Sequence, residues 1–69
     1  MRKPNSMEMR VLRHFVGSYI ENPGAFPRGA GRKTLDGMVA MGWIVWVESP
    51  ETNEEGYQIT EEGERARYA

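Results

Sequence analysis

The sequence predicts a small α+β domain with the order helix, loop, helix, β-hairpin and short C-terminal helix. First, residues 34–48 change from helical spacing of apolar side chains to a β-branched and aromatic run, with Gly42 between the two parts. Second, helix-start patterns at Asn5 and Thr60 flank this stretch. Third, a polar, proline-containing segment separates two strand-like runs. The 69 residues suffice for one domain, so we expect a single domain with a flexible tail at residues 1–4.

The first helix is predicted to begin after Asn5. Glu8, three residues further on, can close a capping box with that N-cap. The helix is expected to run to about Glu21, because proline at position 23 disfavours helical geometry in the residue before it. The apolar stripe expected to face the core consists of Met9, Leu12, Phe15, Val16, Tyr19 and Ile20.

Residues 24–31 are predicted to form a packed loop, since they contain Pro27 and three glycines. One helical turn around Ala25 and Phe26 would place the Phe26 ring in the core. A full helix is not expected here.

The second helix is predicted to begin at Gly31 or Arg32 and to end at Met41, which places it at residues 32–41. Gly37 inside it costs about 1 kcal/mol relative to alanine. With Gly37 and Ala40, the outward face of this helix carries no large side chain there. A phosphate backbone, a partner helix or the protein's own loop can therefore approach that face closely. The core-facing residues are Leu35, Met38 and Val39, and the outward ones are Lys33, Gly37 and Ala40.

Gly42 is predicted to end this helix in a left-handed conformation, which glycine adopts without steric cost. In a Schellman ending, Trp43 would pack back on Met38. Trp43 and Trp46 are an odd number of residues apart, so along a strand they point to opposite faces. We therefore expect one of the two indoles to be partly exposed.

The hairpin is predicted from strands at 43–48 and 57–59, joined by a polar loop at 49–56. Thr60 then suits the N-cap of a final short helix. The charged residues of that helix match the helix dipole, with acids first and bases last: Glu61, Glu62, Arg65 and Arg67.

Composition excludes several classes of protein. The chain has no cysteine, which rules out disulfides and thiolate metal sites. His14 is the only histidine, and the glycines near Lys33 lack the spacing of a phosphate-binding loop, so we expect no enzyme activity and no cofactor. The acidic residues have no EF-hand spacing, so no metal site is predicted. No apolar run is long enough to span a membrane, and a cytoplasmic location is expected.

Charge is divided unevenly along the chain. Residues 1–35 contain seven basic and two acidic residues, whereas residues 36–69 contain two basic and eight acidic ones. This division can present a basic face to an acidic partner. Both halves can equally be ordinary solvated surface, since folding can intermix them.

The pattern of the second half resembles the winged helix-turn-helix domains of MarR-like and PadR-like regulators. Residues 41–44, Met-Gly-Trp-Ile, match the exit from the recognition helix, and residues 59–63, Ile-Thr-Glu-Glu-Gly, match the end of the wing. The match covers Leu35 to Ala66, and the first helix agrees in position only. The resemblance implies a small winged helix-turn-helix-like domain, here in a short, phage-type variant, whose hairpin is the wing.

Two departures separate this sequence from DNA-binding members of those families. The segment before the recognition helix is too rich in proline and glycine for the usual supporting helix. The wing carries acidic residues where those members usually carry Arg or Lys, and negative charges near phosphate repel.

Two functional hypotheses follow. The favoured one is a small DNA-binding transcriptional regulator that reads double-stranded DNA with the 32–41 helix, where the helix dipole and basic side chains attract phosphate. A sequence-specific reader of this size is expected to be a homodimer, because one module offers a small interface. The residues expected to bind DNA are Arg28, Arg32, Lys33, Thr34 and Gly37.

The second hypothesis is a protein-binding winged-helix module that engages a basic protein surface. An example would be a phage-encoded, anti-CRISPR-like inhibitor of a host or defence protein that binds nucleic acid. Electrostatic complementarity would then speed association and set specificity. The residues expected to bind the partner are Glu48, Glu51, Glu54 and Glu55.

Overall fold

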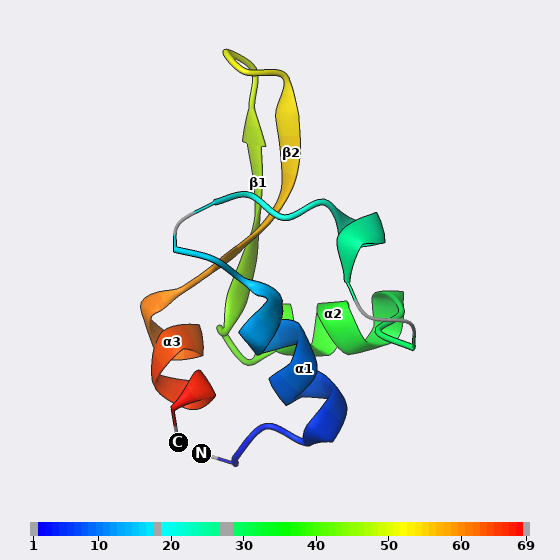
Figure 1. Ribbon diagram of the computed structural model, residues 1–69, viewed down its shortest axis with the longest axis vertical. Helices are drawn as coiled ribbons and strands as arrows, with labels where there is room; N and C mark the ends of the chain where they lie inside the picture. Colours follow the sequence, from blue (N-terminus) through cyan, green and yellow to red (C-terminus); the bar gives the residue numbers. More distant parts are fainter. Residues whose placement is uncertain (1, 18, 27–28, 69) are drawn as a thin grey trace.

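The computed structural model describes residues 2–17, 19–26 and 29–68. Within them the protein is a small α+β fold of three α-helices and one two-stranded antiparallel hairpin (Figure 1). This is the predicted order of elements, and it is compatible with a winged-helix-like layout. In these ranges no helix combines the length and apolar character needed to cross a bilayer. The elements are α1 (Ser6–His14), the 3₁₀ turn η1 (Pro23–Ala25), α2 (Arg32–Ala40), β1 (Ile44–Ser49), β2 (Glu54–Ile59) and α3 (Glu61–Arg67).

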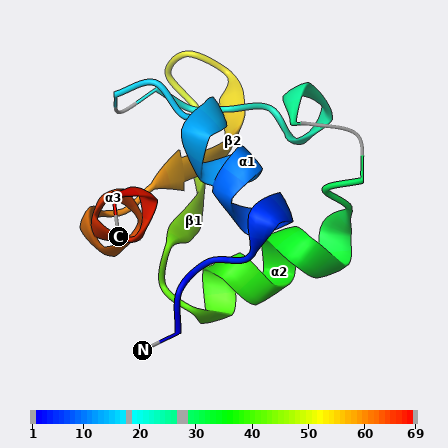
Figure 2. The same ribbon diagram turned by 60° about the horizontal axis from the view of Figure 1, so that its bottom comes forward.

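The core lies where the three helices meet the base of the hairpin, at the lower end of Figure 1. The hairpin tip projects from the opposite end of the molecule, whose longest extent is 36 Å. Figure 2 shows α2 along one side of the molecule, with α1 and the hairpin on its other side. The largest fully buried side chains are Trp43, Leu12, Met38, Ile44 and Val11.

The predicted start of α1 is confirmed and its predicted end is wrong. The Asn5 side chain accepts a hydrogen bond from the Glu8 backbone, and the Glu8 carboxylate accepts one from Asn5 N–H, which completes the capping box. The helix stops at His14 rather than near Glu21. Of the predicted stripe, Leu12 and Phe15 are buried, whereas Val16 and Tyr19 are exposed and Val11 takes a core position.

Long-range contacts end α1 early. Arg67 of α3 donates hydrogen bonds to the carbonyl oxygens of Phe15 (3.1 Å) and Leu12 (3.5 Å) at the helix end. Gly17 turns the chain with φ +55°, and Glu21 then exchanges both backbone hydrogen bonds with Tyr57 of β2. The segment predicted as the last turns of a helix therefore runs alongside the hairpin.

The loop before α2 contains one turn of 3₁₀ helix at Pro23–Ala25, slightly earlier than the turn predicted around Ala25 and Phe26, and no supporting α-helix among its described residues. The Asn22 side chain caps this turn by accepting from Gly24 N–H. Phe26 is buried, and its ring packs at tilted angles against the rings of His14, Phe15 and Tyr57. The aromatic contacts hold the loop against the core.

The junction from α2 to β1 is the predicted Schellman ending. Gly42 has φ +80°, and its N–H bonds to the Val39 carbonyl while Trp43 N–H bonds to the Met38 carbonyl. Trp43 and Met38 are both fully buried. Trp46 is 40% exposed, so one indole is inside and one is partly outside, as its position along the strand predicts.

The hairpin is longer than predicted. Six consecutive residue pairs join the strands, from Ile44 opposite Ile59 to Ser49 opposite Glu54. The predicted strands, 43–48 and 57–59, missed the acidic residues at the start of β2. Asn53 takes φ +58°, a conformation that asparagine tolerates, and so allows the tight turn that pairs these residues.

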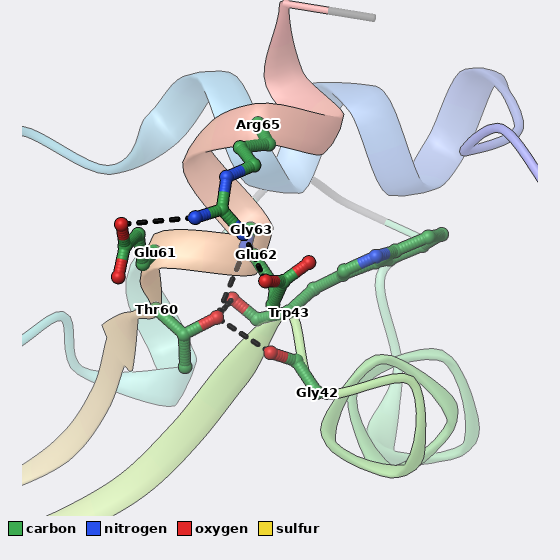
Figure 3. A network of polar contacts seen from close by, with 7 residues as sticks. All are labelled: Gly42, Trp43, Thr60, Glu61, Glu62, Gly63 and Arg65. Carbon is green, nitrogen blue, oxygen red and sulfur yellow. Dashed lines mark hydrogen bonds and ion pairs between the residues drawn. The ribbon is translucent and has the colours of Figure 1, made fainter. Parts of the chain in front are cut away.

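Thr60 joins three elements, as Figure 3 shows. Its hydroxyl accepts a hydrogen bond from Gly63 N–H (3.0 Å), which caps α3 as predicted. The Thr60 hydroxyl oxygen is also within donating distance of the carbonyl oxygens of Gly42 (2.5 Å) and Trp43 (3.0 Å). A Cβ at Gly63 would collide with the Trp43 carbonyl, so this close approach requires glycine.

The exposed Arg2 side chain contacts Glu8 of α1 and the Trp43 ring, while the predicted flexible tail at residues 1–4 stays a prediction. Its guanidinium donates two hydrogen bonds of 2.7 Å to the Glu8 carboxylate and lies 5.3 Å from the Trp43 ring centroid. These hydrogen bonds hold the pKa of the Glu8 carboxyl below its ordinary value, against the opposing effect of burial.

Candidate nucleic-acid interface

The N-terminal end of α2 is open. Its N-cap, Gly31, has no side chain to accept a hydrogen bond from the first turn. The first intrahelical bond runs from Leu35 N–H to the Gly31 carbonyl, so the preceding backbone N–H groups of the helix have no acceptor among the described residues. Those groups, together with the helix dipole, favour an anion at this end.

Two cationic side chains flank this helix end. The Arg32 side chain is 92% exposed, and its Nε lies 3.7 Å from the Asp36 carboxylate. An exposed pair of this kind is worth at most about 1 kcal/mol, so Arg32 can exchange Asp36 for another anion at little cost. Lys33 is exposed and has no ion pair within the described ranges, whereas Thr34 is half-buried.

The outward face of α2 is unobstructed. Gly37 is exposed, and a Cβ built there would meet no atom within 4 Å. Ala40 on the same face is exposed as well. Within the described residues, the protein's own loop therefore does not cover this face of α2. That loop was one of the three possible occupants named in the sequence analysis. Arg28, the remaining residue predicted to bind DNA, lies outside the described residues.

The acidic residues predicted as the alternative binding surface lie on the outer half of the hairpin. Glu48, Glu51, Glu54 and Glu55 are all exposed. Glu48 stands directly opposite Glu55 in the hairpin register, an arrangement that costs stability because like charges face each other. The Glu48 carboxylate accepts a hydrogen bond from Trp46 Nε1 (3.3 Å). Several of these acids line a hollow of about 390 Å³ near the tip.

A groove that sequence reasoning missed runs between α2 and the hairpin. Its volume is about 750 Å³, and it is formed largely by apolar side chains. Val39, predicted to be in the core, is 39% exposed here. Residues of η1, α2 and both strands line the groove, and no local pattern in the sequence indicates that these elements come together. The lining residues are Pro23, Gly24, Ala30, Gly31, Arg32, Leu35, Asp36, Val39, Trp46 and Tyr57.

No cluster of His, Cys, Asp or Glu suited to a metal ion occurs within residues 2–17, 19–26 and 29–68. Comparison of the chain with protein-family models, with curated proteins and with solved structures found no match.

Proposed function

We propose that the protein is a small winged-helix-type DNA-binding regulator that docks α2 in the major groove. The observation that carries this proposal is the open N-terminus of α2, where uncapped backbone N–H groups lie beside the exposed side chains of Arg32 and Lys33. Backbone amides, helix dipole and side chains would all act on the same phosphate or base edge.

The dimensions of α2 support this docking. An α-helix with its side chains is roughly 10–12 Å in diameter and the major groove is about 12 Å wide, so the groove admits the helix over the roughly 14 Å length of its nine residues. The open face at Gly37 and Ala40 presents no large side chain to hold the helix away from the bases. Arg32 and Lys33 at the entering end have the donors that read the O6 and N7 acceptors of guanine.

The proposed complex excludes the hairpin tip. Its four glutamates would repel phosphate, and the tip lies at the far end of the molecule from the helices (Figure 1). Since a single 3₁₀ turn replaces the supporting helix, phosphate contacts in this complex come mainly from α2. The expected affinity is therefore modest and strongly dependent on salt.

Fluorescence anisotropy with labelled duplexes of about 30 base pairs, titrated at several salt concentrations, tests this proposal. The double variant Arg32→Ala/Lys33→Ala should bind at least about tenfold more weakly, with a salt slope smaller by about two. Arg10→Ala/Arg13→Ala is the matched control, because it removes the same charge from exposed positions on α1. Docking through α2 would be refuted if both double variants lost the same amount of DNA affinity. It would also be refuted if Arg32→Ala/Lys33→Ala bound DNA as tightly as the wild type.

A second function is favoured by one specific observation. Four exposed glutamates gather on the hairpin, and two of them oppose each other at a cost in stability. A basic protein surface would relieve that repulsion. The alternative proposal is therefore a protein-binding module, such as a phage-encoded inhibitor of a nucleic-acid-binding protein.

A pull-down from cell lysate with the tagged protein, with and without nuclease, separates the two functions. The DNA proposal is supported if the tagged protein captures nucleic acid and if the proteins that co-purify with it are lost on nuclease treatment. One protein captured in stoichiometric amount after nuclease, and lost with Glu51→Gln/Glu54→Gln, supports the alternative. Glu61→Gln/Glu64→Gln on α3 is the charge-matched control and should retain that protein.

A further inference from the structure

Asp36 is the only acidic residue of α2, and it lies beside the open outward face of that helix. It follows Lys33 by three positions and precedes Ala40 by four, spacings that make both residues its neighbours on the helix surface. Its side chain is 64% exposed, and a Cβ at Gly37, the next residue, would meet open space. A DNA duplex docked on this face therefore meets the Asp36 carboxylate together with Lys33.

The Asp36 carboxylate is unfavourable at this place for two reasons. Its negative charge repels the phosphates that border the major groove. Helix stability does not favour its pair with Arg32 either, because a base placed four residues before an acid is the less favourable order along the helix dipole. Arg32 itself stands at the end of α2 where the dipole favours anions. The pair is therefore not one that the stability of the helix would select.

The position of Asp36 leaves the outer end of the Arg32 guanidinium to another ligand. The Asp36 oxygen Oδ2 lies 3.7 Å from Nε, the nitrogen nearest the backbone, so the ion pair is made at the inner side of the group. A guanidinium is planar and carries its five N–H donors in a fixed fork. An anion beside Nε therefore restrains the plane of the group without occupying the two terminal nitrogens, Nη1 and Nη2. Those two nitrogens match a pair of acceptors that lie side by side.

We propose that Asp36 is a positioning residue that makes Arg32 read guanine, so that the protein selects duplexes with a guanine at the entering end of α2. This role requires α2 to dock in the major groove and so rests on the proposed function. Nη1 and Nη2 of Arg32 donate to O6 and N7 of the guanine, while Asp36 holds Nε. The preferred ligand is thus double-stranded DNA with a guanine–cytosine pair at that position.

Asp36 also discriminates against the phosphate backbone. A phosphate on Arg32 would bring a second negative charge next to the Asp36 carboxylate, and the two anions repel. The major-groove edge of guanine presents acceptors without a net charge, so Asp36 keeps its place when Arg32 binds there. The exposed pair is weak in water, and its attraction grows when the docked duplex excludes water. Asp36 therefore increases the preference for the right base at a cost in affinity for DNA of any sequence.

Lys33 has a different role in this complex. It is exposed and has no ion pair within the described ranges, and an ammonium is a point charge without the planar fork of arginine. It therefore binds phosphate with little regard to sequence. Lys33→Ala should weaken binding to all duplexes alike, which makes it the counterpart of a change at Asp36.

Selection from a pool of randomised duplexes, followed by fluorescence anisotropy, tests the role of Asp36. The wild type enriches its preferred duplexes, and the guanine whose replacement by adenine weakens binding most is identified. The guanine preference is the ratio of the dissociation constants for the two duplexes. Asp36→Ala should lower that ratio about tenfold. Its affinity for a duplex of unrelated sequence should stay the same or rise, because one negative charge near phosphate is removed.

Two further variants show whether Asp36 acts through Arg32. Glu64→Ala removes an exposed carboxylate from α3 and should keep the wild-type ratio. In the Arg32→Ala background, Asp36→Ala should leave the ratio unchanged, because the guanine contact is already lost. The role of Asp36 is overturned if Asp36→Ala keeps the wild-type guanine preference or weakens binding to every duplex equally. It is also overturned if the ratio still falls in the protein without Arg32, or falls as much in Glu64→Ala.

The DNA-binding function and the role of Asp36 can fail separately. If no duplex is retained from the pool, the proposed function is wrong and the role of Asp36 falls with it. If duplexes are retained without a preference for guanine, the role of Asp36 alone is wrong. Docking through α2 is then still supported by the loss of binding in Arg32→Ala/Lys33→Ala.

Discussion

The Thr60 hydroxyl lies 2.5 Å from the Gly42 carbonyl oxygen, so one side chain closes the end of α2 and begins α3. The Thr60 hydroxyl oxygen also accepts a hydrogen bond from Gly63 N–H. We predict that Thr60→Val lowers the free energy of unfolding by about 1–2 kcal/mol, since it removes a cap and leaves a carbonyl without its donor. Urea denaturation measures the change. Thr60→Ser keeps the hydroxyl and should stay near wild type; equal losses in both variants would show that the methyl group matters and the hydroxyl does not.

Gly42 is required for its backbone conformation. At φ +80° an L-residue pays about 1–2 kcal/mol in the left-handed region, and β-branching adds to that cost. Gly42→Val should therefore destabilise the domain more than Gly42→Ala, and Gly42→Asn should be the mildest of the three. Thermal unfolding monitored by circular dichroism measures this order. A melting temperature that valine leaves unchanged would contradict the described helix ending.

Gly37 and Gly63 are both helical, and alanine should act on them with opposite signs. Gly37→Ala meets open space and should stabilise the fold by up to about 1 kcal/mol. Gly63→Ala would push a methyl group into the Trp43 carbonyl and should cost roughly 1–3 kcal/mol. Each variant serves as the other's control when both are measured by urea denaturation. If both substitutions change the free energy of unfolding in the same direction, helix propensity outweighs local packing.

The Glu8 carboxyl should make stability depend on pH in the acid range. Its pKa in the folded state is held below the ordinary value of 4.5 by hydrogen bonds from Arg2 and Asn5. Between the folded-state pKa and the ordinary value, the unfolded state therefore binds more protons than the folded state. The stability that the Glu8 carboxylate contributes is complete above about pH 5 and is lost as pH falls through the folded-state pKa. Glu8→Gln should be less stable at neutral pH and should show a shallower loss of stability toward acid.

Urea midpoints measured between about pH 7 and pH 3 give the two slopes. Glu64→Gln, which removes an exposed carboxyl, is the control and should keep the wild-type slope. Parallel curves for wild type and Glu8→Gln would mean that the Arg2 contact contributes nothing to folding in solution.

Short-range patterns predicted the features that depend on neighbouring residues. The capping box of Asn5, the left-handed Gly42 and the Thr60 cap all follow from the chemistry of a few consecutive residues, and all three are confirmed. The early end of α1 was not predicted, because it depends on Arg67 and Tyr57, which are far away in sequence. Helical spacing continued past His14 in the sequence, and the long-range backbone pairing of Glu21 took precedence over it.

The candidate sites divide in the same way. Helical spacing placed Lys33 and Gly37 on the outward face of α2, where the structure has them. The groove beside Val39 was not predicted, since it depends on how η1, α2 and both strands come together around it. Elements that are far apart in the sequence leave no joint pattern in neighbouring residues.

The different positions of Trp43 and Trp46 give the protein two optical reporters. The indole of Trp43 is fully buried, so its fluorescence should change mainly when the core opens. Trp46 lies half-exposed on β1 and lines the groove, so its emission and its quenching by iodide should respond to whatever binds there. Replacing one tryptophan at a time with phenylalanine would let folding and binding be followed separately.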